Sequence, residues 1–92
     1  MRHESALAIP EHVLTRRAAG ETVLLDLQTE QYYGLDGVGS RLWELIENGT
    51  TIGQAIDALL DEYDVTRETL EADVLRVLSE MHSGGLVLVD NA

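Results

Sequence analysis

The hydrophobic pattern changes its period near residues 31–36, and this change constrains the fold more than any other feature. Before this segment apolar and polar residues alternate, as in strands; after it apolar residues recur every three or four positions, as in helices. Turn signals at residues 18–21 and 28–30 divide the first part into three strands. The sequence therefore predicts an α+β domain in which a three-stranded antiparallel sheet precedes three helices.

The strand candidates cover residues 12–16, 22–27 and 31–35. Side chains alternate between the two faces of a strand, so the adjacent Tyr32 and Tyr33 must point in opposite directions. We expect Tyr33 and Leu35 to face the core. Tyr32 then covers the outer face of the sheet beside Leu24, or it meets a partner, and the sequence alone leaves both interpretations open.

Capping residues place the helices. Asp36 is expected to cap the first helix, which ends at Asn48 and Gly49. Thr51, with Gln54 three residues later, predicts a capping box at the start of the second. The third runs from Thr66 to the two glycines at 84–85, and a short strand follows at 86–89. Residues 1–10 are expected to be loose, which leaves one domain over residues 1–92 with an ordered core at about 12–89.

The helix pair in this order resembles a winged helix-turn-helix unit with its sheet placed first. That arrangement raises the alternative of a DNA-binding regulator. However, the net charge is −11, with 17 acidic residues against six arginines. A nucleic-acid-binding face normally gathers positive charge, so we expect no nucleic-acid partner. A small acidic carrier protein is a further alternative, although the leading strands do not suit its helical bundle.

The sequence shows no pattern typical of a catalytic, metal-binding or cofactor-binding site. The chain has no cysteine, and His3, His12 and His82 stand far apart without a second metal ligand at a suitable spacing. We therefore expect no catalytic residue, no metal site and no cofactor. No stretch resembles a signal peptide or a membrane span, which predicts a soluble cytoplasmic protein.

The open edge of the third strand is the strongest sign of function. In hairpin order this strand pairs only with the second strand, so its other edge can accept an added peptide strand unless the first strand folds over to it. The third helix is the natural second wall, with Val74 and Val77 as an apolar floor and Glu71, Asp73 and Arg76 as a polar rim. The same edge could also pair with a second copy, so a homodimer without peptide is an alternative.

Three ordered runs carry a resemblance to a known family. They are Leu25-Asp26-Leu27, then Gln31-Tyr32-Tyr33-Gly34-Leu35-Asp36, then Leu42-Trp43-Glu44-Leu45-Ile46. Together with the second-helix segments at 49–56 and 58–65, they resemble the PqqD-like proteins over about residues 12–89. Such domains are RiPP recognition elements, which bind the leader peptide of a ribosomally synthesised precursor.

The resemblance implies a free-standing, non-catalytic protein of the B1 type from lasso peptide biosynthesis. It implies three partners: a precursor leader of the Tyr-x-x-Pro-x-Leu type, a B2 leader peptidase, and a lasso cyclase. The net charge of −11 separately predicts that the leader is basic, since it would attract a basic peptide. The PQQ pathway uses the same domain type and remains open. The implied peptide-binding residues are Gln31, Tyr32, Tyr33, Gly34 and Leu35 on the strand and Leu70, Asp73, Val74, Arg76 and Val77 on the third helix.

Overall fold

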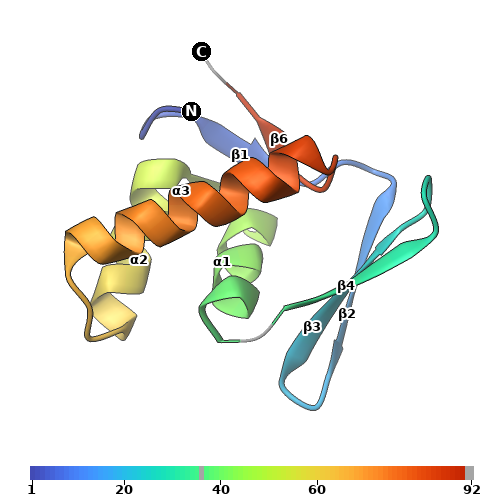
Figure 1. The fold of residues 1–92 in the computed structure, drawn as a ribbon, viewed down its shortest axis with the longest axis horizontal. Coiled ribbons are helices and arrows are strands. Elements are labelled where there is room, and N and C mark those ends of the chain that lie inside the picture. The colour runs from blue at the N-terminus through green and yellow to red at the C-terminus, as the bar shows by residue number, and fades with distance from the viewer. Residues whose placement is uncertain (36, 91–92) are drawn as a thin grey trace.

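The computed structural model describes residues 1–35 and 37–90, and Figure 1 shows how their elements are arranged. The three helices lie together, and one sheet extends away from them. In chain order the elements are β1 (Ala6–Ala8), β2 (Val13–Ala18), β3 (Glu21–Asp26), β4 (Gln31–Leu35), α1 (Gly37–Glu47), β5 (Thr50–Thr51), α2 (Ile52–Glu62), α3 (Arg67–Ser83) and β6 (Leu88–Val89). The predicted sheet, helices and short final strand are confirmed.

The larger sheet has the strand order β2-β3-β4 and is antiparallel throughout. Its register places Leu24 opposite Tyr33, and Leu24 is fully buried. Leu24 and Tyr33 therefore both face the core. The expectation that Tyr32 lies beside Leu24 was wrong. Tyr32 instead lies opposite Leu25, on the outer face.

Asp26 explains why the faces of β3 were difficult to assign. A carboxylate usually faces solvent, yet Asp26 is almost completely buried on the same face as Leu24. Its Oδ1 accepts hydrogen bonds from the backbone N–H groups of Gln28 (2.9 Å) and Thr29 (3.3 Å). These hydrogen bonds satisfy the buried carboxylate, and they stabilise the turn that leads to β4.

A second sheet, with the order β5-β1-β6, was not predicted. The segment expected to be loose contains β1, which pairs with β5 on one side and β6 on the other. Leu7 is 4% exposed and Ser5 is 1% exposed, so this segment belongs to the core. Its backbone also holds the start of α2, because the carbonyl groups of His3 and Ser5 accept hydrogen bonds from Gly53 and Ile52.

The helices begin and end where the sequence indicated. Thr51 and Gln54 form the complete capping box before α2, and Thr66 caps α3 by accepting a hydrogen bond from the backbone N–H of Thr69. Gly49 and Gly85 adopt positive φ values of 88° and 77° after α1 and α3. The predicted cap at Asp36 lies outside the described residues.

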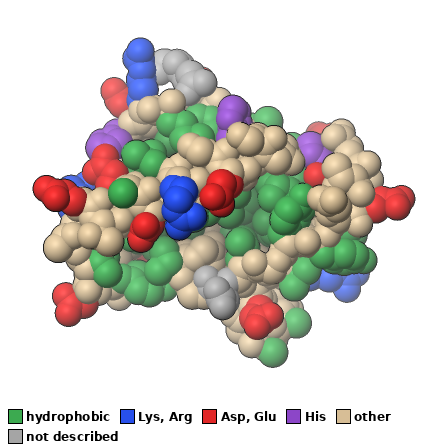
Figure 2. All heavy atoms as spheres, viewed as in Figure 1, with side chains coloured by type: hydrophobic (Ala, Val, Ile, Leu, Met, Phe, Trp, Pro, Cys, Tyr) green, Lys and Arg blue, Asp and Glu red, His purple; other side chains and the backbone are tan. Residues whose placement is uncertain are grey.

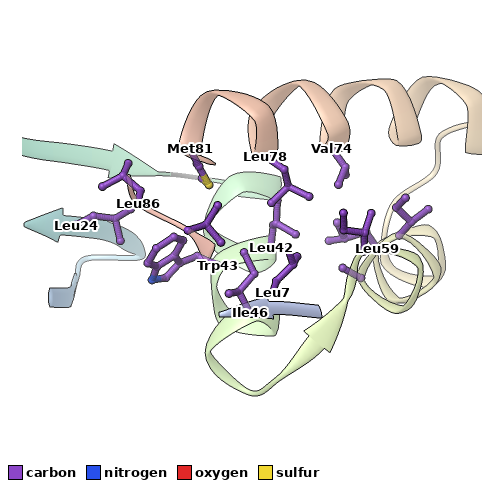
Figure 3. Packing of buried hydrophobic residues seen from close by; sticks show 14 of the residues in the cluster. Leu7, Leu24, Leu42, Trp43, Ile46, Leu59, Val74, Leu78, Met81 and Leu86 are labelled. Atoms are coloured by element: carbon purple, nitrogen blue, oxygen red, sulfur yellow. The ribbon is translucent and has the colours of Figure 1, made fainter. Parts of the chain in front are cut away.

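The core joins the sheet to all three helices (Figure 3). Trp43 is fully buried, and its ring lies beside Leu24 on β3 and Leu86, which follows α3. Its indole N–H donates a 2.9 Å hydrogen bond to the Thr15 hydroxyl on β2, which satisfies the polar end of the ring. This contact and the bond between Thr22 and Ser40 fix the inner face of the sheet against α1.

Candidate functional site

The free edge of β4 is the first part of the candidate site. In the described part of the chain, β4 pairs only with β3, so one row of its backbone N–H and C=O groups has no strand partner. Such an edge is competent to pair with an added strand. Gly34 on this strand has no atom within 4 Å of the position where a Cβ would stand, so the backbone there is open to a close approach.

The second part is a groove along α3, formed by two adjoining cavities that share Val77. The cavity next to β4 has a volume of about 560 Å³ and the cavity next to α1 has a volume of about 240 Å³. We call the two together the α3 groove. The first is lined by Leu24, Tyr32, Tyr33, Gly34, Leu35, Val77, Glu80, Met81 and Leu86. The second is lined by Val38, Gly39, Leu42, Tyr63, Val65, Thr69, Leu70, Asp73, Val74, Arg76 and Val77.

The predicted site residues are brought together along this groove. Nine of the ten line one cavity or the other: the four β4 residues line the cavity next to β4, and Val77 lines both cavities. The other α3 residues line only the cavity next to α1, and they are Leu70, Asp73, Val74 and Arg76. Gln31 does not line either cavity. Its Oε1 accepts a 2.8 Å hydrogen bond from the Tyr33 hydroxyl, so it orients the tyrosine ring.

The floor of the groove is apolar and its rim is charged. Figure 2 shows hydrophobic side chains gathered between α3 and the larger sheet, with acidic and basic side chains on the helix beside them. Asp73 is exposed at the rim, and Arg76 contacts Glu80 at 3.5 Å. Glu71, expected at this rim, instead contacts His3 of the N-terminal segment.

The walls made by α1 and α2 are held together by an ion pair. The Arg41 Nε–H donates to both carboxylate oxygens of Glu62, at 2.8 and 3.0 Å. This hydrogen bonding lowers the pKa of Glu62 and raises that of Arg41. The pair links the two helices beside Tyr63, which lines the cavity next to α1.

Several lining residues were not identified from the sequence. Leu86, Met81 and Glu80 enter the groove because α3 ends beside β4 and the chain turns back under the helix. Helical periodicity indicates that Met81 is buried, but no sequence pattern shows which strand it meets. Val38, Leu42 and Tyr63 belong to the core or pack against it, and they also line the cavity next to α1.

Two further observations concern the described residues only. No cluster of three or more histidine or acidic side chains is arranged to hold a metal ion among residues 1–35 and 37–90. Within the same ranges no helix is both long enough and apolar enough to cross a membrane.

Solved structures show this architecture with a peptide present. The chain is similar to TbiB1 in complex with the TbiA(beta) leader peptide, with 40% identity and a TM-score of 0.84 over 87% of this chain and 93% of that one. It also shares its fold with lasso peptide synthetase B1 complexed with the leader peptide, at 20% identity and a TM-score of 0.81 over 89% and 96% of the two chains.

Sequence comparison assigns the family independently of the fold. No curated protein matches the sequence of this chain. The family model for coenzyme PQQ synthesis protein D (PqqD), however, matches residues 21–87, which include β3, β4, all three helices and both cavities of the groove. This match confirms the family predicted from the three sequence runs: the chain belongs to the PqqD family.

Proposed function

We propose that this protein binds the leader peptide of a ribosomally synthesised precursor and is a B1-type adaptor of lasso peptide biosynthesis. One observation carries the proposal: the unpaired edge of β4 opens directly onto the apolar α3 groove. Similarity to TbiB1, whose structure contains a leader peptide, supports it.

The strand edge and the groove would make different contributions to leader binding. Main-chain hydrogen bonds to β4 give affinity with little sequence preference, while alternate side chains of the added strand enter the groove and give selectivity. Tyr33, Leu35 and Val77 line the cavity beside the added strand. The net charge of −11 would favour a basic leader, because it attracts the peptide before contact.

Delivery is the second half of the proposed function. We propose that the protein is not an enzyme and that it presents the bound leader to a B2 leader peptidase and a lasso cyclase. An adaptor with this role must hold the leader while leaving other surface free for an enzyme. The groove leaves the outer face of the larger sheet unoccupied.

A fluorescence-anisotropy titration tests the first half. A labelled leader peptide from the precursor encoded beside this gene is titrated with the protein, and the matching core peptide serves as the control. We expect saturable binding of the leader and none of the core peptide. No binding of either at tens of micromolar protein, a range in which leader affinities for a working adaptor should be measurable, would refute the proposal.

A further inference from the structure

The cavity next to β4 has one charged side chain among the described residues that line it, and this side chain is Glu80. The other lining residues are glycine, aliphatic residues, methionine and two tyrosines. The cavity next to α1 is different, because it is lined by one acidic and one basic residue, Asp73 and Arg76. The lining residues of the first cavity therefore carry a net negative charge, whereas those of the second are balanced.

Glu80 is held only weakly by its neighbour on α3. Its carboxylate contacts the Arg76 guanidinium at 3.5 Å, and the side chains of Arg76 and Glu80 are 61% and 69% exposed. Water screens an exposed pair at this helical spacing, so the pair contributes little to stability. A cationic group that enters the cavity can therefore replace Arg76 as the partner of Glu80 at small cost.

The rest of the cavity suits the side chain of a lysine or an arginine. Tyr32 and Tyr33 line it from β4, and the face of an aromatic ring attracts a cation. The Tyr33 hydroxyl donates to Gln31, which holds that ring in place. The aliphatic stem of a basic side chain can pack on Val77 and Met81 while its charged end reaches Glu80.

Strand geometry limits which residue of a bound peptide reaches this cavity. Side chains of a strand added to the β4 edge would alternate between the two faces of the larger sheet. Every second side chain would share the face of Tyr33 and Leu35, which line the cavity. The residues between them would point to the outer face, away from Glu80.

We propose that Glu80 is a specificity-determining residue, which pairs with a lysine or arginine at an inward-facing position of the added leader strand. This proposal rests on the proposed function, since it assumes that the groove holds the leader. It goes further than the attraction exerted by the net charge of −11, which would act on a basic residue anywhere in the leader. Glu80 would instead select a positive charge at one position.

Anisotropy titrations with Glu80→Gln test the proposal, using the labelled leader of the precursor encoded beside this gene. The control is Glu68→Gln, which removes the same charge from the first turn of α3, outside the residues that line the groove. Glu80→Gln should bind the leader about tenfold more weakly than the wild type, and the control less than about twofold, because only Glu80 would make a direct pair. Circular dichroism checks that both variants are folded.

Variants of the leader identify the partner of Glu80. Each lysine and arginine of the leader is replaced in turn by glutamine. One of these peptides should lose affinity for the wild-type chain and lose no more in Glu80→Gln, as a double-mutant cycle requires of a direct pair. Glu80→Lys should bind the natural leader poorly and should recover when that leader residue becomes glutamate. A residue that only supported the fold would show no such recovery.

The outcomes separate this proposal from the proposed function. If the wild-type chain binds no leader, the proposed function fails and the Glu80 pair fails with it. The proposed function stands and the Glu80 pair is overturned if the leader binds but Glu80→Gln matches the control. The same conclusion follows if the leader binds without containing a lysine or an arginine, or if the loss of affinity is spread evenly over all its basic residues.

Discussion

The side chain of Tyr33 belongs to both the core and the candidate site. Its ring packs against the buried cluster and lines the groove, and its hydroxyl donates to Gln31. Replacing Tyr33 with alanine should weaken leader binding by about 1–3 kcal/mol, as expected when an aromatic anchor is truncated. Tyr33→Phe keeps the ring and should lose much less. Anisotropy gives the affinities and circular dichroism checks the fold; an unchanged affinity in a folded Tyr33→Ala protein would remove Tyr33 from the site.

Asp26 couples the stability of the β3–β4 turn to pH. Burial opposes its ionisation, but hydrogen bonds from the backbone N–H groups of Gln28 and Thr29, with the nearby His12, hold its pKa below the ordinary value of 3.8. A carboxylate with a lowered folded-state pKa stabilises the fold above its unfolded pKa and loses that contribution as the pH falls through the folded value.

The pH dependence can be measured with one isosteric variant. Asp26→Asn should melt at a lower temperature than the wild type at pH 7, and the gap should shrink as the pH is lowered below 3.8. Thermal melts followed by circular dichroism at several pH values would show this. A gap that stays constant across the acid range would mean that the charge of Asp26 contributes nothing.

The sequence could reveal that β3 alternates but not which of its faces is buried. Val23, Leu25 and Leu27 form an apolar row, whereas the opposite row contains Thr22 and Asp26. Polarity alone favours burial of the first row. The second row is buried because Thr22 pairs with Ser40 and Asp26 with the turn, and these partners become visible only when the chain is folded.

Among the helices, the start of α2 depends on a capping box that can be recognised in the sequence. The Thr51 hydroxyl accepts from the backbone N–H of Gln54 at 3.2 Å, and the Gln54 side chain accepts from the backbone N–H of Thr51 at 3.1 Å. Thr51→Ala should lower the free energy of unfolding by about 1 kcal/mol, since an N-cap acceptor is lost. Thr51→Ser retains the acceptor and should cost less. Urea unfolding measures both, and equal losses would count against the capping role.

The strand β1 shows the opposite case, in which the determinants are distant in sequence. Its partners, β5 and β6, lie about forty and eighty residues further along the chain, and a three-residue strand has no periodicity of its own. No local signal could therefore predict it. The helices and β2–β4 were predictable because their patterns and caps are local.

Burial of Leu7 makes this strand testable. Leu7→Ala should destabilise the protein by about 2–5 kcal/mol, the usual cost of emptying a fully buried leucine site. Leu88→Ala is the control, because Leu88 is in the neighbouring strand β6 but is 53% exposed. Urea unfolding of both variants gives the comparison. If Leu7→Ala were as stable as the control, the N-terminal segment would not be part of the core.

For the whole molecule, net charge governs how a basic peptide approaches. Asp73 is exposed at the rim of the groove, so Asp73→Arg should slow association with a basic leader and reduce its dependence on salt. Glu68→Arg makes the same charge change in the first turn of α3, outside the residues that line the groove, and should slow association less. Stopped-flow association rates at low and high salt distinguish the variants. Identical rates for all three proteins would show that steering at the rim is absent.

The pairing of β1 with β6 also determines how this domain can be joined to other polypeptides. Leu7 lies opposite Val89, and the backbone N–H of Asp90 donates to the carbonyl of Ala6, so the first and last strands lie side by side (Figure 1). Neither strand belongs to the sheet that carries the open edge. A host protein could therefore receive the whole domain at a single surface loop, with entry and exit a strand's width apart, and the groove and the larger sheet would both stay clear of the junction.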